Sequence, residues 1–233
     1  MRIFACIIVI MLFAAGAARA QMDVPSDTTL TPINKSDAHW KVLQKEIEQI
    51  TKSAPESSIG NKLERVGRIE GKAIRSLFPG WEFYALRYSN YKKEGFDGKP
   101  VSLAFGLGHT LAIGPDSREG MRLYHHGNHE EYGHLLRETK VAISNASDAE
   151  LVWHAFCEIH RKAWKGYKVE KVSAREWRLG VHGYDQTISV VDGVSTIVRR
   201  THFMQVTTDA SSKQITAWKS IVETSNQRLE RMQ

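Results

Sequence analysis

The first twenty residues have the three parts of an export signal. A basic start, Met1-Arg2, precedes the apolar run from Ile3 to Ala15, and Ala18-Arg19-Ala20 forms an A-x-A cleavage site. Residues 1–20 are therefore predicted to be a signal peptide, and we expect an exported protein, periplasmic or extracellular, that begins at Gln21. The apolar run is shorter than the roughly 20 residues that cross a bilayer, and no later run is longer, so a membrane span is not expected.

The exported chain would contain a single cysteine. The sequence has two cysteines, and Cys6 leaves with the signal peptide, so Cys157 has no partner for an internal disulfide. Residues 21–233 must therefore build an ordinary hydrophobic core, and they are long enough for one large domain or two small ones. All six tryptophans follow the cleavage site, and we expect them to anchor that core.

The charge balance is mildly basic. The formal net charge is +6, and it falls by two when Arg2 and Arg19 are removed with the signal peptide. An excess of this size favours acidic surfaces, but it is too small to predict specific nucleic-acid binding.

The mature chain opens with a leader and two expected helices. Residues 21–37 are polar, contain two prolines and show no apolar period, which predicts a flexible leader. Apolar residues at helical spacing, with Asp37 as the N-cap, predict a helix over residues 38–52. A second apolar stripe predicts a helix from Leu63 to Leu77, which ends at Pro79-Gly80 because proline cannot continue the hydrogen-bond ladder.

Beyond Gly80 the apolar period changes to that of strands. The expected elements are, in order, strands at Trp81 to Tyr91 and Val101 to Leu107 joined by a loop at 92–100, a hairpin of Thr110 to Gly114 with Met121 to Tyr124, a helix from His129 to about Leu136, and a strand from Thr139 to Ser144. Asn128 and Glu131 have the spacing of a capping box for that helix.

The last third of the chain predicts one long helix followed by strands. Ser147 and Glu150 form a capping box, the apolar face continues to Trp164, and Gly166 is placed to end the helix. Gln214 to Glu223 fits either a helix or a strand, and we favour a strand. The other expected strands are Tyr167 to Val172, Glu176 to His182, Asp185 to Val191 and Val194 to Val206, with Asp192-Gly193 as a hairpin turn.

These elements predict an α+β fold in which antiparallel sheet is packed by amphipathic helices. The predicted divisions are the signal peptide 1–20, the leader 21–37, an N-terminal unit 38–144, a helix-plus-sheet unit 145–224 and a polar tail 225–233. Both units open with Ser-Asp-Ala before a helix, which hints at two related units. From about residue 147 to 206, a helix is followed by a strand that bears Trp177 and a strand that ends in Val-Asp-Gly. This order is similar in outline to PepSY or cystatin-like modules, a resemblance that implies a fold and no function.

The densest group of chemically active side chains lies between Tyr124 and His134, where four histidines and two glutamates occur. On a helix Glu130 and His134 share one face, and His125 or His126 could complete a zinc site from the preceding loop. The metalloprotease motif H-E-x-x-H is absent. The alternative is a solvated polar loop that binds nothing, which we favour, so we expect no cofactor.

Cys157 offers a second candidate for chemistry. It lies three residues from both His154 and His160, a spacing in which imidazoles could activate a thiol. Phe156 and Ile159 border it on a strongly apolar helix, which favours a buried and inert cysteine instead.

Basic residues follow the main helix and continue on a predicted strand. Arg178, Arg199 and Arg200 are the candidate anion-binding residues, and an acidic envelope polymer is the partner they would suit. The alternative is an ordinary solvated sheet face, because acidic residues interrupt the basic run.

No motif in the mature chain specifies a reaction, so no catalytic residue is assigned and we expect no enzyme activity. The sequence favours a noncatalytic binding or envelope-associated module, whose partner is an acidic polymer or another exported protein. The first alternative is a metal-dependent hydrolase that uses the His125–His134 cluster with Glu131 as general base. The second is an inhibitor or folding accessory of a secreted enzyme.

Overall fold

The computed structural model describes residues 29–53, 63–88, 91–94, 100–103, 108–124, 129–161, 167–191 and 194–229. The predicted signal peptide lies outside these ranges and stays a prediction. Two antiparallel sheets and four helices confirm the α+β fold. Among the helices described, none combines the length and the apolarity that a membrane span requires.

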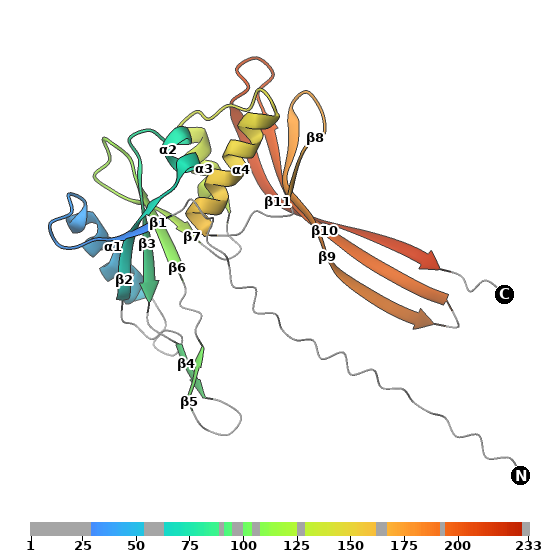
Figure 1. The fold of residues 1–233 in the computed structure, drawn as a ribbon, viewed down its shortest axis with the longest axis horizontal. Helices are drawn as coiled ribbons and strands as arrows, with labels where there is room; N and C mark the ends of the chain where they lie inside the picture. The colour runs from blue at the N-terminus through green and yellow to red at the C-terminus, as the bar shows by residue number, and fades with distance from the viewer. Residues whose placement is uncertain are drawn as a thin grey trace, which may run out of the picture.

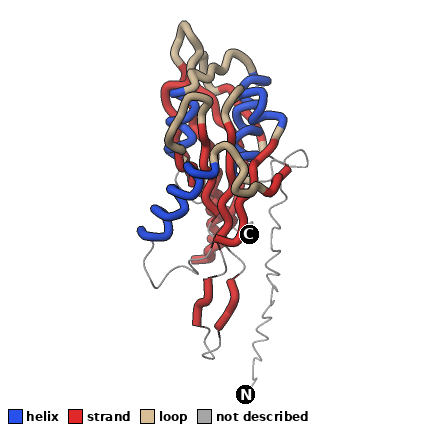
Figure 2. The backbone as a smooth tube through the Cα atoms, turned by 90° about the vertical axis from the view of Figure 1, so that its left-hand side faces the viewer, coloured by secondary structure: helices blue, strands red, loops and turns tan. Residues whose placement is uncertain are grey.

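The first sheet has five antiparallel strands in the order β1-β2-β3-β6-β7. These strands are β1 (Thr29–Pro32), β2 (Leu63–Glu70), β3 (Glu82–Tyr88), β6 (Gly108–Ile113) and β7 (Met121–Tyr124). A separate hairpin of β4 (Tyr91–Glu94) and β5 (Pro100–Leu103) projects from the end of this sheet (Figures 1 and 2).

One face of the first sheet is covered by α1 (Trp40–Ser53). Leu43 of this helix is fully buried and packs in a small cluster with side chains from β3 and β6, namely Tyr84, Leu86, Leu111 and Ile113. Because side chains alternate along a strand, the intervening residues of β3 and β6 point to the opposite face. There Phe83, Ala85 and Ala112 belong to the main core, so this sheet is buried on both faces.

The second sheet has four antiparallel strands in the order β11-β10-β9-β8. They are β8 (Lys168–Lys171), β9 (Glu176–Val191), β10 (Val194–Thr208) and β11 (Ile215–Leu229). The last three are about three times the length of an ordinary strand of 5–6 residues. Figure 1 shows them running past the helices, away from the first sheet.

A layer of helices separates the two sheets (Figure 1). It consists of α2 (Lys72–Leu77), α3 (Glu130–Glu138) and α4 (Ala146–His160). One continuous core joins Phe83 and Leu123 of the first sheet to Phe156 of α4 and to Trp177 and Trp218 of the second sheet. The two units expected from the sequence therefore share a single hydrophobic core.

A buried carboxylate joins α4 to α2. The Glu158 side chain accepts hydrogen bonds from the backbone N–H of Ala73 at 3.1 Å and of Ile74 at 2.8 Å. These are first-turn amides of α2, which have no partner within their own helix, so Glu158 acts as its N-terminal cap. Gly71 makes the approach possible, because a Cβ there would lie 2.1 Å from Glu158 Oε2.

A second close approach occurs inside the long sheet. Gly180 has a φ of +66° at a bulge in β9, where the register against β10 shifts between His202 and Met204. A Cβ at Gly180 would lie 2.2 Å from the Trp153 ring of α4. The glycine thus lets the twisted strand lie directly against the helix.

The helix expected from Leu63 to Leu77 is wrong over its first half. Leu63–Glu70 forms β2, and only Lys72–Leu77 forms a helix, α2. Val66 packs with the α1 cluster and Ile69 with the main core, so the apolar stripe serves the two faces of a strand. Pairing with both β1 and β3 outweighs the local helical pattern.

Two further segments differ from the expectation for their region. Thr29–Pro32, assigned to a flexible leader, pairs with β2 as an edge strand of the first sheet. The strand expected from Thr139 to Ser144 is reduced to one isolated bridge, between Ala142 and Gln214. Lys140, with a φ of +54°, lies in the left-handed region that interrupts an extended path.

The ends of α4 also differ from their predicted caps. Asn145, rather than Ser147, is the N-cap, and its side chain accepts a hydrogen bond from the Asp148 N–H at 3.1 Å. The helix ends at Arg161 in the left-handed conformation, before the expected stop at Gly166. Gly166 lies outside the described residues.

The N-cap of α3 differs from the expected one. His129, one residue after the expected Asn128, is the N-cap, and its own side chain makes no cap hydrogen bond. Asn128 lies outside the described residues. The helix itself and the hairpin of β6 with β7 are confirmed, with Ala112 opposite Met121.

The C-terminal strands are longer than expected. Glu176 to His182 and Asp185 to Val191 form a single strand, β9. The preference for a strand over a helix at Gln214 to Glu223 is confirmed, but β11 continues to Leu229, into the predicted polar tail.

Candidate functional site

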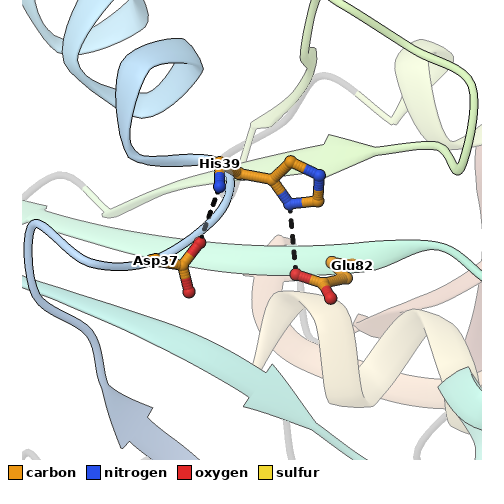
Figure 3. A group of neighbouring side chains, drawn as sticks. All are labelled: Asp37, His39 and Glu82. Carbon is orange, nitrogen blue, oxygen red and sulfur yellow. Dashed lines mark hydrogen bonds and ion pairs between the residues drawn. The ribbon is translucent and has the colours of Figure 1, made fainter.

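Three possible metal ligands meet where α1 begins. One ligand atom from each of Asp37, His39 and Glu82 lies within 4.8 Å of the others, and this is the one such group of three or more among the described residues. His39 Nδ1 lies 3.2 Å from Glu82 Oε2, and the His39 N–H donates to Asp37 Oδ1 at 2.9 Å (Figure 3).

Local backbone structure positions these three side chains. Asp37 begins the turn that leads into α1, in which its carbonyl oxygen accepts a hydrogen bond from the Trp40 N–H at 3.0 Å. Glu82 is the first residue of β3. Tyr84, two residues along the same strand, reaches His39 Nδ1 at 3.0 Å with its hydroxyl oxygen.

An arginine already supplies the positive charge in this group. Arg68 Nη2 donates to Asp37 Oδ2 at 2.8 Å, and Arg68 Nε lies 3.6 Å from Glu82 Oε2. The Tyr84 hydroxyl donates to Asp37 at 3.1 Å and contacts Glu82 as well. A divalent cation would have to displace the guanidinium from both carboxylates, so this donor set does not fit a metal site.

The pKa shifts of Asp37 and Tyr84 are those expected when these side chains bond to one another and to Arg68. Burial opposes ionisation of Asp37, but hydrogen bonds from His39, Arg68 and Tyr84 outweigh it and hold the Asp37 pKa below the ordinary value of 3.8. Burial, followed by the Glu82 carboxylate, raises the pKa of the Tyr84 hydroxyl far above its usual range. We interpret this group as an ion-pair clamp that fastens the start of α1 to β2 and β3.

The sequence did not reveal this clamp. The sequence predicts Asp37 as an N-cap and nothing more, because its partners Arg68 and Glu82 are distant along the chain. Arg68 and Tyr84 become neighbours because β2 and β3 pair in that register, and β2 was expected to be a helix. To predict the clamp from sequence, residues 63–70 would have to be recognised as a strand that pairs with β3.

Two of the four predicted zinc ligands, Glu130 and His134, lie in the described part of the chain. Glu130 and His134 lie one turn apart on the exposed side of α3. His129, next to Glu130 in sequence, is buried, with its ring 5.2 Å from that of Phe156. The remaining predicted ligands, His125 and His126, lie outside the described residues, so the zinc site stays a prediction.

Cys157 is fully buried, as expected. Its neighbour His160 is also buried, with Nδ1 2.9 Å from the Phe156 carbonyl oxygen and its ring packed against the Phe156 ring. A thiol without solvent exposure cannot meet a substrate in this conformation.

The three candidate anion-binding arginines are not gathered into one patch. Arg178 is held by Glu223 in a bidentate pair of 2.8 and 3.2 Å, and its guanidinium lies 4.5 Å from the Phe203 ring centroid. Arg199 and Arg200 are exposed, but as consecutive strand residues they point to opposite faces. Arg178 pairs with Gln205, six residues along β10 from Arg199 and thus about 20 Å away.

The long sheet leaves two backbone edges without a partner among the described residues. On one side, β8 pairs with β9 only as far as Val181, so no described strand pairs with this side of residues 183–191. On the other, β11 pairs only with β10. The bridge of Ala142 to Gln214 covers just the start of β11, and its edge is open from Thr216 onward.

Comparison of the chain with models of known protein families, with curated proteins and with solved structures finds no match.

Proposed function

We propose that this chain is an exported, noncatalytic binding module that binds another exported protein through the open edges of the long sheet β9-β10-β11. The observation that carries the proposal is the length of the β11 edge, from Thr216 to Leu229, that has no strand partner among the described residues. Such an edge presents a row of backbone N–H and C=O groups to which an added strand can hydrogen-bond.

The long strands have few of the features with which proteins usually protect an edge. No proline occurs between Glu176 and Leu229. In the β10–β11 ladder the only register shift lies between Thr207 and Thr208, near the start of β11. Val222 on β11 is half exposed, at 50%. A regular, partly apolar edge of this length favours pairing with a further strand.

The noncatalytic part of the proposal is supported by the described ionisable groups. The cluster of Asp37, His39 and Glu82 is closed by Arg68, and Cys157 is buried. Neither arrangement has the free nucleophile or base, next to an open position for substrate, that hydrolysis requires.

An acidic envelope polymer is the second candidate partner. The exposed side chains of Arg199 and Arg200 favour it, whereas Arg178 is held by Glu223. Attraction of this kind weakens with salt. Binding that survives high salt therefore indicates strand addition rather than polymer binding.

Site-specific photo-crosslinking tests the proposal. A photoreactive residue is placed at Val222 in the full chain expressed in exporting cells, and an identical residue at Leu30 serves as the matched control. Leu30 is also an exposed apolar residue on an edge strand, but of the short β1. We expect a discrete protein adduct from position 222 and none from position 30. Absence of any adduct at 222, or equal adducts at both positions, would overturn the proposal.

A further inference from the structure

The charges on the open edge of β11 are arranged symmetrically about Ile221. Between Thr216 and Asn226 the strand carries two charged residues, Lys219 and Glu223. Each lies two residues from Ile221, so all three side chains point to the same face of the sheet. Lys219 is exposed and Glu223 is half exposed even while paired with Arg178.

We propose that β11 pairs antiparallel with β11 of a second copy of this chain, about a two-fold axis at Ile221. The two long sheets then join into one continuous sheet. This inference rests on the proposed function, because it uses the β11 edge. It names a second copy of the chain as the strand that binds there.

Symmetry restricts the possible registers. An antiparallel pair of identical edges is related by a two-fold axis perpendicular to the sheet, which places like faces side by side. The axis must then pass through a residue, because an axis between residues would oppose side chains that point to different faces. Centring on Lys219 or on Glu223 opposes like charges, which destabilises a pair.

Centring on Ile221 is the register between Thr216 and Asn226 that opposes unlike charges. Lys219 of each copy then faces Glu223 of the other, on either side of an Ile221 pair. On the opposite face Val222 lies beside Ser220 and diagonal to Val222 of the second copy. Its exposed side chain is thereby partly buried.

The covered start of β11 limits the length of the pairing. In this register Thr216 faces Asn226, and residues nearer the start would meet the segment that bridges Ala142 to Gln214. The pairing therefore spans residues 216–226 in each copy. The β9 edge at residues 183–191, which no described strand covers, stays open for a different partner.

The first test is the oligomeric state of the purified mature chain, residues 21–233, by analytical ultracentrifugation over a wide concentration range. We expect a reversible dimer. Hydrogen exchange should show amides of residues 216–226 gaining protection as concentration rises, while the α1 amides do not change. A chain that stays monomeric at all concentrations overturns the inference.

Charge exchange tests the register itself. In Lys219→Glu both symmetric contacts become Glu–Glu, which should raise the dimer Kd by about tenfold or more. Glu223→Lys should weaken its own dimer similarly. An equimolar mixture of the two variants should form heterodimers close to wild-type affinity, because each contact is again Lys–Glu. Lys168→Glu, the same change on exposed β8, is the matched control and should have no effect.

The outcomes separate this inference from the proposed function. A dimer that Lys219→Glu does not weaken, or that mixing does not restore, contradicts the register. A monomer whose position 222 cross-links to a different exported protein refutes self-pairing and retains the binding module. A monomer without any adduct refutes both.

Discussion

The two sheets of this protein are buried to different extents. The five-stranded sheet lies between α1 and the layer of helices, and its central strands place apolar side chains on both faces. In the described part of the chain, helices cover part of one face of the long sheet, where Trp177, Leu179 and Trp218 lie. Among the described side chains of its opposite face, Phe203 is buried, with the Arg178 guanidinium over its ring. The first sheet is thus built for stability, whereas the second keeps a large part of its backbone available to a partner.

The largest expected effect is in the first sheet. Phe83→Ala removes a fully buried ring and should lower the free energy of unfolding by about 3–5 kcal/mol. Ile221→Ala on the long sheet is its counterpart and should cost less than about 1.5 kcal/mol, because Ile221 is only partly buried. Urea unfolding of the mature chain measures both. Equal losses in the free energy of unfolding for the two variants would contradict the difference in burial between the two sheets.

The contact between α4 and α2 should be next in size. Gly71→Ala forces the Glu158 carboxylate away from the amides of α2, and we expect a loss of about 2–3 kcal/mol from the buried groups left without partners. Gly67→Ala on β2 is the matched control, because its Cβ would meet only ordinary contacts at 3.5 Å or more. Thermal melts compare the two, and similar Tm losses would mean that Glu158 does not act as a cap.

The Asp37 clamp should produce a pH-dependent effect of intermediate size. Because the native pKa of Asp37 is below its ordinary value of 3.8, ionised Asp37 stabilises the fold above that pH. The contribution is lost as pH falls through the lowered pKa. Asp37→Asn should therefore cost about 1–2 kcal/mol at neutral pH and progressively less under acid conditions. A difference between variant and wild type that stays constant from neutral pH to pH 3 would contradict the clamp.

The smallest effect is expected on the exposed face of the long sheet. Arg178→Ala removes a partly exposed ion pair and a cation–π contact, which together should contribute about 1 kcal/mol or less. Urea unfolding at low and high salt checks this, since screening should reduce the ion-pair share. A loss as large as that of Phe83→Ala would show that Phe203 anchors a core of its own.

Elements whose apolar pattern agrees with their tertiary partners could be predicted from sequence. The helix beginning after Asp37, the hairpin of β6 with β7 and the long helix α4 could be predicted because the apolar period and the turn residues that indicate them are local in sequence. The apolar stripe from Leu63 to Leu77 predicts a helix, but its first half is a strand, β2, whose two faces are buried in different clusters. A sequence window cannot distinguish such a strand from a helix when its partners lie elsewhere in the chain.

The candidate sites also divide into those that local sequence predicts and those that depend on contacts between distant segments. Burial of Cys157 followed from its apolar neighbours, which are local in sequence. The group of Asp37, Arg68 and Glu82 depends on the pairing of β2 with β3, and neither spacing nor composition indicates it. Which of His129 and His134 is buried likewise depends on which side of α3 meets the core.

By itself the sequence determined an α+β chain with one cysteine outside the predicted signal, whose apolar residues are sufficient for a disulfide-free core. Local periodicity and capping carry that information, since they depend on residues within a few positions of one another. The tertiary structure decided that both units share one core, that Arg68 neutralises the Asp37 cluster, and that β11 forms an open edge. Each of these depends on strand order and register, because contacts between distant segments are fixed by how the whole sheet pairs.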